Sequence, residues 1–121
     1  MSKEEAIYTF FSAFGDAYEE SSVPTGKNAP SYPYLTYTVP TDSFNFPTAG
    51  QCSLWYKENT WLNADAKAKE ICAALPKIIA CDGGGVLLTK GSPFSQRMSE
   101  PADSRVRRVF INITAEFITA D

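Results

Sequence analysis

Four arginines stand close together in the C-terminal third of the chain, and their chemistry is the most distinctive in the sequence. The stretch Ser92–Met98 (SPFSQRM) leads through a short acidic loop into RVRRVFINITAEF. The cluster consists of Arg97, Arg105, Arg107 and Arg108. Guanidinium groups pair bidentately with carboxylates and phosphates and stack on aromatic rings. Such a cluster suits a catalytic clamp, a nucleic-acid surface or a contact with another protein.

The remaining sequence offers these arginines no catalytic partner. The chain has no histidine, which removes the commonest general base and the commonest metal ligand. No spacing brings two carboxylates together as glycosidases or metal-dependent enzymes require. Asp82–Gly85 resembles a phosphate-binding loop only in its glycines, because a strand is expected to follow it instead of a helix. We therefore expect no enzyme activity, no cofactor and no metal.

Composition favours one soluble domain. The 121 residues carry 14 acidic and 11 basic side chains, a net charge of −3 that gives no general attraction to nucleic acid. The N-terminus lacks the pattern of a secretory signal, and no apolar run is long enough to span a bilayer, which indicates an intracellular protein. The cysteines have no CxxC spacing, and we expect free thiols at Cys52, Cys72 and Cys81.

Hydrophobic periodicity predicts an α+β fold in the order α-β-β-α-β-β-β. A capping box at Ser2 and Glu5 starts the first helix. The helices are expected at 3–14 and 62–75, the strands at 34–39, 51–57, 77–81, 86–90 and 105–119, a further short extended piece at 92–98, and loops at 19–33 and 40–50. The long, alternating last strand indicates a mainly antiparallel sheet with both helices packed on one face. The whole chain, 1–121, is expected to form a single domain.

Strand alternation separates the arginines. Arg105 and Arg107 share the apolar side of the last strand, whereas Arg108 points to the other side. Two hypotheses remain open: the arginines pair locally with Glu100 and Asp103, or they contact another subunit.

The loop before the second strand carries two phenylalanines, Phe44 and Phe46. They either pack under the loop, which is the default, or await a partner. Four aromatic residues of the predicted sheet offer surfaces on which bases could stack, although an RNP-type pattern is missing. These are Tyr34, Tyr37, Trp55 and Tyr56.

Several blocks of the sequence resemble small tail-assembly proteins of long-tailed phages and prophages. The blocks are FFSAFGDAYEESSVP, SYPYLTYTVP, SLWYKENTW, PFSQRM, SEPADS and VRRVFINITAEF. Their order and spacing match over nearly the whole chain, without any catalytic signature. Within this group the chain is most similar to the tail terminator, or tail-completion, family.

This resemblance implies a structural protein without enzyme activity or cofactor. Such subunits form a ring, expected to be a hexamer, that caps the head-proximal end of the tail tube and stops its polymerisation. The implied partners are further copies of the chain, the tail tube protein and the head–tail connector protein, with DNA passing through the lumen without specific binding. The implied location is the virion, after assembly in the host bacterial cytoplasm and without contact with a membrane.

The residues expected at subunit interfaces are those of the arginine cluster, its acidic loop and the aromatic loop. They are Arg97, Arg105, Arg107, Arg108, Glu100, Asp103, Phe44 and Phe46, with Glu19 and Glu20 as further acidic candidates. A head–tail connector or stopper, or another minor virion subunit, is the alternative within the same class. A small nucleic-acid-binding domain is the alternative outside it.

Overall fold

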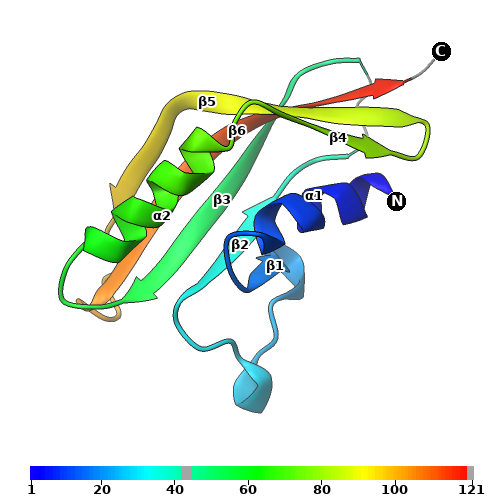
Figure 1. Ribbon diagram of the computed structural model, residues 1–121. Coiled ribbons are helices and arrows are strands. Elements are labelled where there is room, and N and C mark those ends of the chain that lie inside the picture. The colour runs from blue at the N-terminus through cyan, green and yellow to red at the C-terminus, as the bar shows by residue number, and fades with distance from the viewer. Residues whose placement is uncertain (42–44, 120–121) are drawn as a thin grey trace.

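The computed structural model describes residues 1–41 and 45–119 and shows an α+β fold, as the sequence predicts (Figure 1). The helices and strands are α1 (Lys3–Ser12), β1 (Ala17–Glu19), β2 (Tyr34–Thr38), β3 (Thr48–Lys57), α2 (Leu62–Ala73), β4 (Lys77–Cys81), β5 (Gly84–Met98) and β6 (Val106–Thr119). Two short 3-10 turns, η1 (Glu20–Ser22) and η2 (Gly26–Asn28), lie between β1 and β2.

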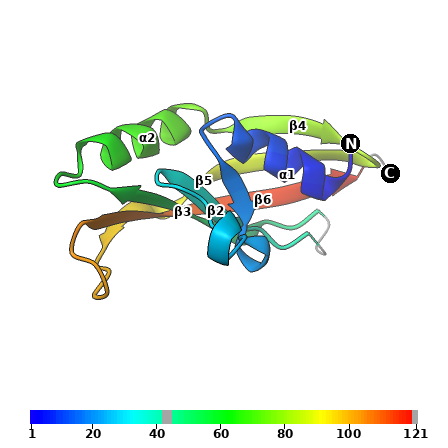
Figure 2. The same ribbon diagram turned by 90° about the horizontal axis from the view of Figure 1, so that it is seen from below.

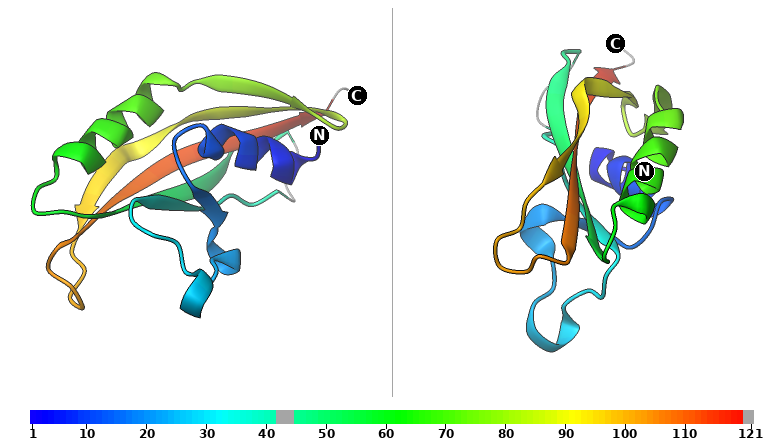
Figure 3. Two further views of the ribbon diagram at one scale, coloured as in Figure 1. Left: turned by 60° about the horizontal axis from the view of Figure 1, so that its bottom comes forward. Right: turned by 90° about the vertical axis from the view of Figure 1, so that its left-hand side faces the viewer.

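The strands form a single sheet in the order β1-β2-β3-β6-β5-β4. β1 runs parallel to β2, and the other neighbours are antiparallel. β6 lies between β3 and β5, so the chain's last strand is central and β1 and β4 are the edges. The sheet is long, twisted and curved (Figure 3).

Both helices cover one face of this sheet, as predicted (Figure 2). The covered face carries every second residue of the central strands, including Cys52 and Leu54 of β3 and Val109, Ile111 and Ile113 of β6. This alternation is the pattern expected of a sheet with one buried face. The opposite face, which we call the open face, carries polar and aromatic side chains.

A local signal explains where α1 begins. The Ser2 hydroxyl accepts a hydrogen bond from the Glu5 N–H, and the Glu5 carboxylate accepts one from the Ser2 N–H, which is the predicted capping box. The Ser2 N–H and hydroxyl lower the pKa of Glu5. The N-cap of α2 is Trp61, which makes no side-chain capping bond, and Asn63 in the first turn donates to the Glu58 carboxylate.

The structure adds one strand that the sequence did not predict. β1 has three residues and pairs in parallel with β2, so it has no alternation long enough to recognise. β3 begins at Thr48 and not at residue 51, because Thr48, Ala49 and Gly50 pair with β6. The loop predicted at 40–50 therefore ends before Thr48.

The predicted short piece Ser92–Met98 is the second half of β5. A register shift between Lys90 and Ser95 interrupts the pairing with β6, and β5 continues beyond it to Met98. The Asn112 side chain donates to the Pro93 carbonyl at 2.8 Å and bridges this irregularity. Sequence periodicity breaks at such a bulge, so one long strand resembles two pieces.

Candidate interaction surfaces

Arg97 and Arg107 lie on the helix side of the sheet and both contact Trp61. Their guanidinium carbons lie 5.0 Å and 5.6 Å from the centre of the Trp61 ring. Arg97 also donates to Asp65 in the first turn of α2, at 2.5 Å. These two side chains thus connect the start of α2 to the end of β5 and the start of β6.

Arg107 is partly buried, and among the described residues no carboxylate lies within 4.0 Å of it. Its two terminal nitrogens donate to the Ser104 carbonyl at 2.6 Å and the Asn59 carbonyl at 3.0 Å. Its Nε is buried and has no hydrogen-bond partner among the described residues. Arg107 therefore holds two loops of its own chain.

Arg108 lies on the open face, as alternation predicted, and is held there by three neighbours. It donates to the Ser53 hydroxyl at 3.1 Å and to the Glu100 carboxylate at 3.3 Å. Its guanidinium carbon lies 4.7 Å from the centre of the Trp55 ring. The hypothesis of local pairing thus holds for Arg108 and Glu100.

Trp55 continues a row of aromatic contacts across the open face. Its ring lies nearly parallel to that of Tyr34, with the centroids 6.1 Å apart, and its Nε1 donates to the Thr36 hydroxyl at 2.9 Å. Tyr37 and Tyr56, by contrast, are buried on the helix side, and burial raises the pKa of both. The four candidate stacking residues therefore do not share a surface.

Asp103 organises the loop between β5 and β6. Its carboxylate accepts a hydrogen bond from the Arg105 N–H at 2.9 Å and forms an ion pair with Lys57 at 2.9 Å. These contacts lower the pKa of Asp103, the Arg105 N–H most strongly. The Arg105 side chain is 62% exposed, and its Nε lies 3.9 Å from the same carboxylate, beyond hydrogen-bond distance.

The structure describes only one of the two phenylalanines in the loop before β3. Phe46 is 70% exposed, so the expectation that it packs within the chain is wrong. Phe44 lies outside the described residues. Ile78, on the edge strand β4, is likewise 70% exposed.

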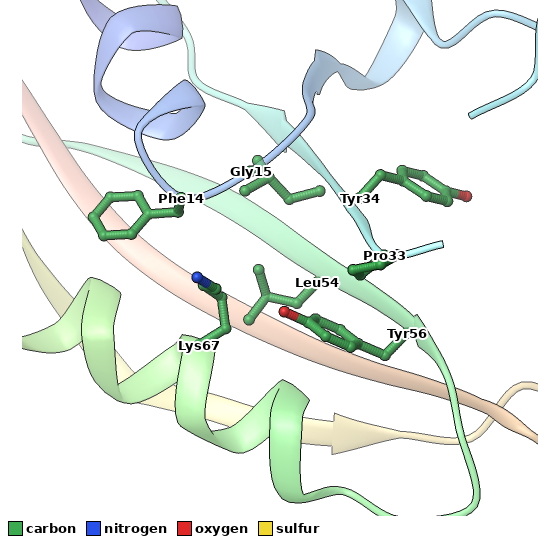
Figure 4. A pocket seen from close by; sticks show the side chains of 8 residues that line it. Phe14, Gly15, Pro33, Tyr34, Leu54, Tyr56 and Lys67 are labelled. Carbon is green, nitrogen blue, oxygen red and sulfur yellow. The ribbon is translucent and has the colours of Figure 1, made fainter. Parts of the chain in front are cut away.

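At least four hollows lie beside the helices in the described part of the chain. The smallest, shown in Figure 4, is lined by eight residues that include Phe14, Leu54, Tyr56 and Lys67, and its volume of about 30 Å³ suits a water molecule better than an organic substrate. A groove of about 610 Å³ separates α1 from β4 and is mostly apolar. A third, of about 290 Å³, lies beside α1 and β2, and a fourth, of about 280 Å³, lies between α2 and β5.

The third hollow brings together two carboxylates, those of Glu4 and Glu19, that the sequence spacing did not link. In residues 1–41 and 45–119, no group of three or more acidic, cysteine or histidine side chains is placed to hold a metal. The three cysteines are free, and only Cys52 is fully buried, where burial raises the pKa of its thiol strongly. The glycine loop is a hairpin turn at Asp82 and Gly83, followed directly by β5.

Comparison with family models, curated proteins and solved structures finds no match for the chain. Among the described residues, no helix is both long and apolar enough to cross a membrane.

Proposed function

We propose that this protein is a structural subunit of a long-tailed phage or prophage and acts as its tail terminator. In this role it caps the head-proximal end of the tail tube, stops polymerisation of the tube and joins the tail to the head connector. It works as a ring of copies through which DNA passes. Its chemistry is that of protein contacts, without a catalytic step.

The observation that supports this proposal is the place of the resembling blocks in the fold. They are separated along the chain, yet they contribute to five neighbouring strands, β1-β2-β3-β6-β5. FFSAFGDAYEESSVP spans the end of α1 and β1, SYPYLTYTVP contains β2, and SLWYKENTW covers the end of β3. The C-terminal blocks form the end of β5, the following loop and most of β6. The resemblance therefore covers a contiguous sheet.

The use of the charged residues also favours an assembly role. Arg107 and Arg108 stabilise the end of their own sheet, and Glu100 pairs with Arg108. Large apolar side chains stay exposed at separate places, among them Phe46 and Ile78. Single exposed apolar side chains are common on protein surfaces, so the support for an assembly role rests mainly on the resembling blocks.

Deletion of the gene from the phage or prophage tests the proposal. We expect tails of uncontrolled, excessive length that do not join heads, seen by negative-stain electron microscopy. The wild-type gene supplied in trans should restore tails of uniform length. Tails of normal length joined to heads in the deletion strain would refute the proposal.

The same experiment separates the terminator from a connector or stopper. Loss of a connector or stopper should leave finished tails of normal length and heads that lose their DNA. A nucleic-acid-binding domain would instead show tight binding to DNA or RNA that weakens steeply with salt.

A further inference from the structure

Charge is distributed unevenly between two parts of the molecule. Residues 1–22 carry five acidic side chains and one basic side chain, whereas residues 97–108 carry four arginines and two acidic side chains. The first segment comprises α1, β1 and η1, and the second contains the loop between β5 and β6. This loop lies at the far end of the sheet from α1 (Figures 1 and 3). A single subunit therefore presents complementary charges at two distant places.

The acidic part contains a groove that we call the acidic groove. Its volume is about 290 Å³, and its lining residues are Glu4, Ile7, Glu19, Tyr37, Val39 and Thr41. Ile7 and Tyr37 are buried. The hollow thus combines two carboxylates with a partly apolar lining, which suits the methylene stem and charged head of an arginine.

The carboxylates beside this groove accept hydrogen bonds from hydroxyl and amide groups and form no ion pair with a described residue. Glu4 accepts a hydrogen bond from the Thr41 hydroxyl at 3.0 Å, and Glu20, close by on η1, accepts one from the Thr38 hydroxyl at 2.5 Å. Glu19 accepts from the Ser21 N–H at 3.1 Å. Among the described residues, no lysine or arginine lies within 4.0 Å of these three carboxylates.

Lys3 precedes Glu4 in the sequence and contacts other groups. Its ammonium donates to the Thr41 carbonyl at 3.0 Å and lies 5.3 Å from the centre of the Phe117 ring. The two acidic side chains of the groove therefore keep oxygen atoms available to another cation.

Arg105 is the member of the arginine cluster best placed to supply that cation. Arg107 and Arg108 are held by their own chain, and Arg97 is paired with Asp65. The Arg105 side chain is mostly exposed, and its carboxylate neighbour, Asp103, is already bonded to Lys57. Its guanidinium can therefore form a second, stronger pair without breaking a short contact.

We propose that Arg105 of one copy inserts into the acidic groove of a second copy and pairs with Glu4 and Glu19. The contact joins two different surfaces, so it is heterologous: repeated copies close into a ring when the rotation permits and otherwise grow as a filament. This inference rests on the proposed function, since a capping subunit must contact its own copies, and it identifies the surfaces that do so.

Charge reversal on each side of the contact tests the inference on the purified full-length protein. The variants are Arg105→Glu, Glu4→Arg and the double variant that carries both changes. Lys90→Glu is the matched control, because it makes the same change of charge at an exposed residue outside both surfaces. Sedimentation velocity over a range of protein and salt concentrations measures association, and circular dichroism verifies folding.

We expect the wild type and Lys90→Glu to associate, and each single reversal to weaken association at least about tenfold. The double variant should recover most of the loss, and added salt should weaken wild-type association. A Glu19→Gln variant, which only removes a charge, should lie between wild type and Glu4→Arg.

Three results would overturn the inference: a wild-type protein that stays monomeric in low salt, single reversals that associate like wild type, or a double variant without recovery. Because the readout uses purified protein, it is independent of the tail-length experiment. Association through these residues together with normal tails in the deletion strain would reject the terminator role and leave the contact intact. Overlong tails together with unaffected association of Arg105→Glu would support the terminator role and reject the proposed contact.

Discussion

At the scale of single residues, the arginine cluster divides into different roles. Arg107 and Arg108 were grouped by sequence because they are adjacent, yet the strand places them on opposite faces, with Trp61 and Trp55 as their respective aromatic contacts. Alternation predicted the faces correctly. It could not predict the Ser53 hydroxyl or the Asn59 carbonyl as partners, because these come from β3 and the turn after it.

Substitution of Arg108 by alanine should destabilise the protein by about 1–3 kcal/mol. The buried Ser53 hydroxyl and the half-buried Glu100 carboxylate would both lose their partner, and Trp55 would lose its cation. Urea denaturation followed by circular dichroism measures the change. Arg105→Ala is the matched control, and we expect it to cost less than about 0.5 kcal/mol because its side chain is largely exposed. Equal losses for the two variants would contradict the assignment.

Asp103 should make stability depend on pH in acid. Its pKa is lowered in the folded state, so its contribution is present above the ordinary value of 3.8 and is lost as the pH falls through the lowered pKa. Asp103→Asn should therefore be less stable than wild type at neutral pH and lose less stability on acidification. Urea midpoints measured from neutral pH down to about pH 3 test this, with the exposed Asp16→Asn as a control for loss of charge. Parallel curves for wild type and Asp103→Asn would refute it.

At the scale of elements, the long strand pair β5–β6 shows what periodicity detects and what it misses. The alternation of β6 is regular, and its predicted start is one residue from the observed one. β5 is interrupted near Gly91, and only the tertiary pairing shows that residues on both sides of the interruption belong to the same strand. β1 was missed because its three residues become a strand only by pairing with β2.

Gly91→Ala should destabilise the protein by about 1–3 kcal/mol, because β5 approaches β6 closely at this point. A Cβ atom at residue 91 would lie 2.8 Å from both the carbonyl carbon and the Cβ of Asn112. One strand would have to move away from the other. Thermal unfolding tests this, and Ser95→Ala on the same strand, where the side chain is exposed, should have little effect. A Gly91→Ala variant as stable as wild type would show that the strands separate there without cost.

At the scale of the whole molecule, a single cluster of buried residues connects both helices with the sheet. α1 contributes Ile7 and Phe11 to this cluster, α2 contributes Ile71, and the central strands contribute the largest share. One shared core means that no group of elements has apolar contacts independent of the rest. A chain of this size with one core should unfold cooperatively.

Unfolding should therefore follow one transition wherever it is observed. The two tryptophans provide local reporters, since Trp55 lies on the open face and Trp61 contacts Arg97 and Arg107 on the helix side. We expect the single-tryptophan variants Trp55→Phe and Trp61→Phe to show fluorescence transitions that each coincide with circular dichroism of the same variant. Separate transitions within one variant would indicate that one face of the sheet melts independently.

Sequence alone determined the fold class, both helices, the covered face of β6 and the absence of histidine chemistry. These properties depend on local periodicity, capping and composition, all of which can be recognised from residues that are close together in the sequence. Tertiary structure decided that exposed Arg105 has no carboxylate within hydrogen-bond distance, that Phe46 stays outside the core, and that Glu4 and Glu19 share a groove with Ile7 and Tyr37. Those outcomes depend on side chains brought together from distant segments, because the register between strands, and not the spacing along the chain, sets their neighbours.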